Sequence, residues 1–134
     1  MTNELDDHAR KLLDGANLAV LATVNADGSP QTSAVWVGRD GDDVLISSTA
    51  GLRKIRNLEA EPRTSLIVID ATDPLRYAEI RGTASITEDV DRVVAQALAT
   101  KYAGAEAAAE YAELPPEVRR VVVRITPHHV VTRG

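Results

Sequence analysis

Short apolar runs that alternate with polar residues predict a mainly β chain with inserted α-helices. The segment NLAVLATV (residues 17–24), the Asp27-Gly28 turn signal and QTSAVWV (residues 31–37) together predict a β-hairpin. Further strands are expected at residues 44–48, 64–71, 77–87 and 119–134, the last either as one strand or as two pieces bent at Pro127. Most connections are too short for parallel crossovers, so the pattern favours a six-stranded antiparallel barrel.

Helical spacing of apolar residues occurs in the segments between these strands. Helices are expected at residues 4–14, 49–61, 88–103 and 105–113. In the second of them, Thr49 is the expected N-cap and Pro62 ends the run. No repeat, linker or change of composition divides the chain, which predicts one domain spanning residues 1–134.

The charges of the second predicted helix oppose its dipole. Arg53, Lys54 and Arg56 lie at the positive N-terminal end, whereas Glu59 and Glu61 lie at the negative end. Each misplaced charge costs roughly 0.3–1 kcal/mol at low salt. A function that needs cations at this point would explain such an arrangement.

An anion-binding site is one such function. The first N–H groups of a helix are unpaired and attract phosphate, and Arg and Lys side chains add charge and hydrogen bonds. Ser47, Ser48 and Thr49 add hydroxyl groups just before the helix. The pattern therefore predicts a phosphate cradle, and the alternative is a solvated basic surface paired with Glu59 or Glu61 at helical spacing, Glu59 lying three residues after Arg56.

Composition limits the other classes of function. The 134 residues carry a net charge of −5, which argues against binding to nucleic acids or anionic membranes. The chain has no cysteine, which excludes disulfides, thiolate metal sites and a cysteine nucleophile. A polar start and the lack of a long apolar run favour a cytoplasmic protein.

Familiar catalytic motifs are missing from the sequence. His128 and His129 are adjacent in a predicted strand and point to opposite faces, so no metal site is expected. The sequence has no G-x-S-x-G, P-loop or G-x-G-x-x-G motif. No catalytic residue is identified, and any reactive group is expected to come from a cofactor.

Four segments carry a resemblance to a known family. They are LATVNADGSPQTSAVWV, VLISSTAGLRKIRNL, EPRTSLIVID and YAEIRGTASITED. Together they resemble the pyridoxamine 5'-phosphate oxidase-like superfamily of flavin-binding split β-barrels. Within it, the chain is most similar to the small actinobacterial branch that binds the deazaflavin coenzyme F420. The resemblance is strong over residues 17–87 and loose in the final strand.

The resemblance implies a homodimer with two cofactors at the subunit interface. It assigns the cofactor phosphate to Arg53, Lys54, Arg56 and Asn57, and the ring to Val35, Trp36, Ser47, Ser48 and Thr49. Tyr77, with Leu75 and Arg76, is expected to reach over from the other subunit. From the residues alone, Trp36 is equally well read as a core or interface anchor and Tyr77 as an exposed strand aromatic.

The resemblance also implies a function. The chain lacks the C-terminal arginine- and histidine-containing motif of true pyridoxamine-phosphate oxidases, so that activity is not expected. It has Leu75 where some deazaflavin-binding relatives carry tryptophan. The expected function is hydride transfer from reduced coenzyme F420 (F420H2) to a small conjugated organic substrate. An FMN-dependent oxidase or reductase and a non-catalytic flavin carrier are the alternatives.

Overall fold

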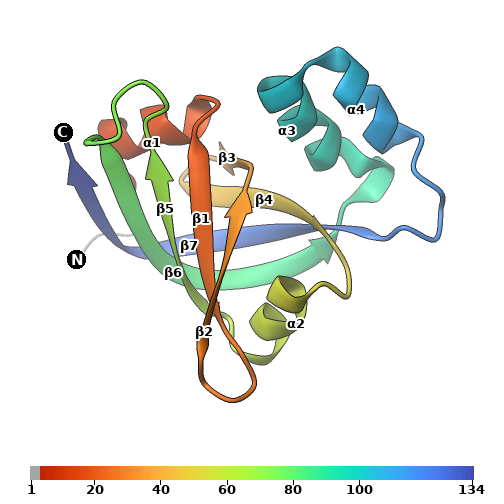
Figure 1. The fold of residues 1–134 in the computed structure, drawn as a ribbon, viewed down its shortest axis with the longest axis horizontal. Coiled ribbons are helices and arrows are strands. Elements are labelled where there is room, and N and C mark those ends of the chain that lie inside the picture. The colour runs from red at the N-terminus through yellow and green to blue at the C-terminus, as the bar shows by residue number, and fades with distance from the viewer. Residues whose placement is uncertain (1–3) are drawn as a thin grey trace.

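A curved antiparallel sheet with helices around it forms the fold in our computed structural model, which describes residues 4–134 (Figure 1). The strands are β1 (Leu18–Val24), β2 (Pro30–Val35), β3 (Val37–Asp40), β4 (Asp43–Thr49), β5 (Arg63–Ile69), β6 (Tyr77–Glu88) and β7 (Arg120–Arg133). The helices are α1 (Asp7–Asp14), α2 (Arg53–Ala60), α3 (Val93–Ala103) and α4 (Ala105–Ala112), with a 3₁₀ turn η1 (Val90–Arg92) before α3. The strand order is β2-β1-β5-β6-β7-β4-β3.

The predicted strand at residues 31–37 is two strands. It breaks at Trp36, so that β2 pairs with β1 at one edge of the sheet and β3 pairs with β4 at the other. Residue 36 thus connects the two edge strands, β2 and β3, covalently, and the barrel is completed by this connection. The prediction of six strands is wrong by this one division, since residues 4–134 form seven strands. The continuous run AVWV contains no glycine or proline that would have indicated the break.

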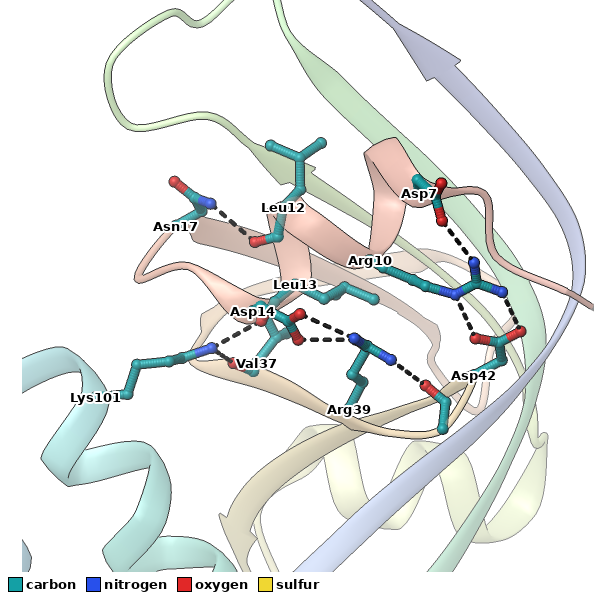
Figure 2. Close-up of polar contacts among 11 residues, drawn as sticks. Asp7, Arg10, Leu12, Leu13, Asp14, Asn17, Val37, Arg39, Asp42 and Lys101 are labelled. Carbon is teal, nitrogen blue, oxygen red and sulfur yellow. Dashed lines mark hydrogen bonds and ion pairs between the residues drawn. The ribbon is translucent and has the colours of Figure 1, made fainter.

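Side chains of α3 hold the chain at this crossing. The Val37 N–H donates a hydrogen bond to the Tyr102 hydroxyl (3.1 Å), which in turn donates to the Asn17 carbonyl (2.7 Å). The Lys101 ammonium group donates to the carbonyls of Val37 and Leu13, and so connects α3 to β3 and to the end of α1 (Figure 2). These bonds satisfy polar groups next to the point where the strand is interrupted.

The core lies inside the barrel and is closed by a helix at each end. Alternate residues of the strands point inward, and the fully buried ones include Leu21, Ile46, Leu66, Ile80, Val123 and Ile125. Helix α1 buries Ala9, Leu12 and Leu13, and helix α2 buries Ile55 and Leu58. Burying each large aliphatic side chain stabilises the fold by about 1.5–3 kcal/mol.

A pair of arginine clamps fixes α1 to the β3–β4 hairpin. Arg10 donates to both carboxylate oxygens of Asp42 (2.9 and 3.0 Å), and the Leu5 N–H donates to the same carboxylate (3.2 Å). Arg39 on β3 makes a matching two-bond contact with Asp14 (2.8 and 2.9 Å), as Figure 2 shows. The clamps join the N-terminal helix to the edge of the sheet that β3 forms.

The last strand is continuous rather than bent into two pieces. β6 and β7 pair along most of their length, with a bulge between Arg81 and Gly82 on β6 opposite Pro127–His129 on β7. A Cβ at Gly82 would lie 2.2 Å from the Thr126 carbonyl oxygen, so the close approach of the strands requires glycine here. Helices α3 and α4 are inserted between β6 and β7 and lie on one side of the barrel (Figure 1). Among the described residues, no helix is long and apolar enough to cross a membrane.

Candidate functional site

Helix α2 has the reversed charge pattern that the sequence indicated. Its first turn contains no acidic residue and its last turn contains no basic residue. The prediction that Thr49 is the N-cap is wrong. Thr49 is the last residue of β4, where it pairs with Arg120. Gly51, at φ +90°, lies between the strand and the helix. Leu52 occupies the N-cap position, and no side chain of the described part of the chain caps the helix. The free N–H groups at this end are therefore not satisfied by a protein side chain.

The three cations of α2 differ in their surroundings. Arg53 and Arg56 are exposed, whereas Lys54 is partly buried and lines a cavity. None of the three forms an ion pair within residues 4–134, so the alternative pairing of Arg56 with Glu59 is not formed. Burial, together with the positive charge of Arg120, lowers the pKa of Lys54 below its ordinary value. Lys54 thus carries an uncompensated charge toward the cavity.

The cavity has a volume of about 280 Å³ and lies where β4, β7 and α2 meet the helices α3 and α4. Its lining residues are Leu18, Ala34, Val35, Trp36, Ser47, Ser48, Leu52, Lys54, Ala95, Tyr111 and Arg120. The fold therefore brings together five of the predicted residues, namely Val35, Trp36, Ser47, Ser48 and Lys54. Four of the five predicted ring-contact residues and one predicted phosphate-contact residue thus line a single cavity, and Thr49 is not among its lining residues.

Trp36 forms an aromatic wall of this cavity. Its ring stacks on Tyr102 (centroids 5.3 Å apart, planes at 7°) and meets Tyr111 edge-on (6.4 Å). The side chain nevertheless remains 37% exposed. One part of the ring anchors α3 and α4 to the barrel, and the residue also lines the cavity.

Arg120 is a residue of the cavity that sequence reasoning missed. Its guanidinium donates to the hydroxyls of Thr49 (2.8 Å) and Ser47 (2.7 Å) and lies 4.9 Å from the centre of the Tyr111 ring. Burial lowers its pKa. The only sequence signal was a pair of arginines before an apolar strand, which is also typical of a solvated strand end. The strand register, which places Arg120 opposite Thr49, is what brings it into the site.

Other predicted site residues lie outside the cavity. Asn57 is buried, and its side-chain amide donates to Thr23 (3.0 Å) and Asn25 (2.9 Å), which fixes α2 against the turn after β1. Tyr77 begins β6 and does not line the cavity. Its neighbour Leu75 is 77% exposed. A role for Tyr77 and Leu75 at a partner subunit's cofactor stays a prediction.

The fold and the cavity together define a class of protein. A curved antiparallel sheet of seven strands carries a cavity with an aromatic wall, several hydroxyl groups and two cations. The lining contains no carboxylate and no pair of nucleophile and base. Such a site suits a planar ligand with an anionic group, and this combination is typical of flavin-binding split barrels.

Comparison with known proteins gives the family. The family model described as pyridoxamine 5'-phosphate oxidase matches residues 5–134, and the chain belongs to this family. The F420H(2)-dependent biliverdin reductase of Mycobacterium tuberculosis (strain CDC 1551 / Oshkosh) is 30% identical over 126 residues, which cover 92% of this chain and 85% of the relative. The family resemblance predicted from the sequence is confirmed, including its similarity to the F420-dependent branch.

Solved structures agree with this assignment. A structure described as an F420 reductase superimposes with a TM-score of 0.79 at 31% identity and covers 95% of this chain and 98% of its own. A conserved hypothetical protein from Mycobacterium tuberculosis matches with a TM-score of 0.78 at 22% identity, over 100% and 88% of the two chains, and supports the fold alone. The predicted class of enzyme, an oxidoreductase, is confirmed.

Proposed function

We propose that the protein is a reductase that uses F420H2 to reduce a small conjugated organic substrate. The relatives that are 30% and 31% identical bear the names of an F420H(2)-dependent biliverdin reductase and an F420 reductase. The observation in this chain that carries the proposal is Lys54, an unpaired and partly buried cation beside a cavity with an aromatic wall. The substrate class is inferred from the chemistry of hydride addition, which requires an electrophilic carbon.

The residues present fit such a cofactor. The buried Ser48 hydroxyl, in a residue that lines the cavity, has no hydrogen-bond partner among residues 4–134, as expected of a group that serves a ligand. Val35 and Trp36 would bound the ring, and Lys54 with the exposed Arg53 and Arg56 would hold the phosphate and the acidic tail. When bound, the cofactor supplies the hydride, and the chain's own residues orient it and exclude water.

FMN is the second candidate cofactor. The family that matches is described as pyridoxamine 5'-phosphate oxidase, and the resemblance to flavin-binding split barrels makes FMN the alternative. FMN also has a ribityl phosphate that the same cations would bind. It lacks the acidic tail of coenzyme F420, for which the two exposed arginines of α2 offer additional contacts. The cluster of three cations therefore favours the deazaflavin.

We also propose that the protein is a homodimer. The outward-facing residues of β1 and β5 are mostly apolar, and the strand register places Val20 beside Ile67 and Leu18 beside Ile69. Leu18 is 54% exposed and also lines the cavity. A second copy that covers this face would extend the wall of the cavity and reduce the exposed apolar surface.

The test is a comparison of cofactors followed by turnover. We expect coenzyme F420 to bind more tightly than FMN at low salt, and the preference to shrink as salt screens the tail contacts. Oxidation of F420H2 in the presence of quinones, enones and biliverdin is then followed by its absorbance. Tighter binding of FMN would favour the flavin-dependent alternative, and tight binding of F420H2 without any turnover would favour a carrier.

A further inference from the structure

Helix α4 forms part of the cavity wall although none of its own residues is buried. Its contribution to the lining is Tyr111, whose ring meets Trp36 edge-on (6.4 Å between centroids) and lies 4.9 Å from the Arg120 guanidinium carbon. A helix without a buried apolar face gains little from the packing that holds most helices in place. The position of Tyr111 therefore requires another contact that fixes α4.

Arg92 supplies this contact. Its two terminal nitrogens donate to five backbone carbonyls at the end of α4 and in the loop before β7, namely those of Tyr111 (3.5 Å), Ala112 (3.4 Å), Leu114, Pro115 (2.6 Å) and Val118 (3.2 Å). The last carbonyls of a helix have no partner within the helix and carry partial negative charge, which suits a guanidinium group. Within residues 4–134, the side-chain hydrogen bonds that reach residues 105–118 from the rest of the chain all come from Arg92.

The backbone before α3 is held in an unfavourable conformation at this arginine. Asp91 and Arg92 both adopt φ +57°, in the left-handed region that residues with a Cβ atom avoid. Neighbouring side chains maintain it, since the Gln96 amide donates to the Asp91 carbonyl (2.9 Å) and the buried Asp89 carboxylate accepts a hydrogen bond from the Ala95 N–H (2.9 Å). Strain that the surroundings maintain is found most often at functional sites. Residues 89–92 thus hold both parts of the insertion that line the cavity, Ala95 directly and α4 through Arg92.

We propose that Arg92 is a positioning residue of the cavity: its bonds to the end of α4 hold Tyr111 against Trp36 and so fix the wall that bounds the ligand. Arg92 does not itself line the cavity and acts through Tyr111. Without these bonds, no other side-chain hydrogen bond from the described residues keeps α4 in place, and the wall becomes mobile. One consequence, that Arg92 limits the size of the acceptor that the cavity admits, rests on the proposed function. The position of Tyr111 does not.

The first experiment uses the ligand-free protein. Trp36 is the only tryptophan of the chain, so its fluorescence reports on this wall. We expect Arg92→Gln to shift the Trp36 emission to longer wavelength and to increase its quenching by acrylamide, because Tyr111 no longer covers the ring. Tyr111→Ala should give a shift of the same size and the double variant no further shift, since both changes remove one contact. Arg119→Gln removes an arginine charge from an exposed position and should leave the spectrum unchanged.

The fluorescence distinguishes a positioning role from a purely structural one. Spectra are recorded well below the melting temperature of each variant, as determined by thermal melts. An arginine that only stabilises the fold would lower the melting temperature and leave the Trp36 emission of the folded variant unchanged, which would refute the proposal. Arg92→Lys keeps the test decisive if Arg92→Gln fails to fold. Lysine retains the charge but replaces the guanidinium fork by a single nitrogen, so a partial shift is expected and a wild-type spectrum would refute the proposal.

The second experiment measures turnover of F420H2 with quinones of increasing size. We expect Arg92→Gln to raise the KM for small quinones several-fold and to reduce the preference for small over large ones, with a smaller change in kcat, because a mobile wall discriminates less by size. An equal loss of kcat for all quinones with unchanged KM would contradict a role in specificity. Failure of the wild type to oxidise F420H2 with any acceptor would refute the proposed function, and the fluorescence would still decide the role of Arg92.

Discussion

The charge of Lys54 does not stabilise the ligand-free fold. It lies at the positive end of α2, beside Arg120, without an ion pair to any described residue. We expect Lys54→Ala to weaken binding of coenzyme F420 by about 1.5–3 kcal/mol, the range for a hydrogen bond to a charged group. Stability without cofactor should be unchanged or slightly higher, because a cation has left the positive end of a helix.

The pH dependence of the same residue gives a second readout. Its pKa in the folded protein lies below the ordinary value of 10.5, so unfolding takes up a proton between the two values. Lys54 therefore makes the free energy of unfolding rise with pH in that alkaline window, and Lys54→Ala should remove this rise. Melts with and without F420 at neutral and alkaline pH measure both effects, with Lys11→Ala as the exposed control. Unchanged affinity together with a lower melting temperature would make Lys54 an ordinary surface residue.

Individual residues show which parts of the site the sequence could predict. Lys54 was predictable because helix charge order is a local property, and Trp36 because the family motif surrounds it. Arg120 was not predictable, since only the pairing of β7 with β4 brings it to the cavity. Asn57 belongs to the same motif, yet its amide nitrogen is fully used by Thr23 and Asn25. A motif indicates that residues matter without saying which of them face the ligand.

At the scale of elements, the stability that the clamp between α1 and the β3–β4 hairpin contributes should decrease in acid. Hydrogen bonds from Arg10 and from the Leu5 N–H lower the pKa of Asp42 below its ordinary value of 3.8. This contribution to stability is complete above the unfolded-state pKa and is lost as pH falls through the lower folded-state pKa. We therefore expect Asp42→Asn to lower the melting temperature at neutral pH and to differ little from the wild type in strong acid.

A matched control exists on the same arginine. Asp7 also accepts a hydrogen bond from Arg10, but its side chain is fully exposed. Asp7→Asn should therefore have little effect at any pH, because exposed ion pairs contribute little. Thermal melts of both variants across the acid range make the comparison. An equal loss in the two variants would show that the clamp acts through general charge and not through the geometry at Asp42.

Secondary-structure elements were predictable where one local rule decides them. The Asp27-Gly28 turn has its glycine at φ +87°, and α1 ends before Gly15, as expected. The break at Trp36 was missed because the strand changes partners there for a reason that lies in the closure of the barrel. The predicted start of helix α3, residue 88, is too early. Asp91 and Arg92 both adopt φ +57°, a backbone conformation that residues other than glycine rarely take, and α3 begins after them.

At the scale of the whole molecule, the uncovered apolar face of β1 and β5 predicts a dimer. We expect light scattering to give a mass near twice the 14.4 kDa of one chain. Ile67→Glu should shift the mass toward the monomer, because it introduces a charge among the outward-facing apolar residues Val20, Leu18 and Ile69. Thr87→Glu adds the same charge at an exposed position near the end of β6 and should leave the mass unchanged. A wild type that runs as a clean monomer would contradict the proposal.

The insertion of α3 and α4 between β6 and β7 has a consequence for how this protein can change. The insertion begins and ends at neighbouring positions, since Glu88 pairs with Val121 and the Asp89 N–H donates to the Arg120 carbonyl (3.0 Å). Where flexible residues are added to such an insertion, doubling the length of a flexible loop costs only about 0.6 kcal/mol in closure entropy. Its helices supply the Ala95 and Tyr111 side of the cavity. Mutation or recombination in this one segment can therefore remodel one wall of the cavity, provided the contacts of α3 at the barrel crossing are kept.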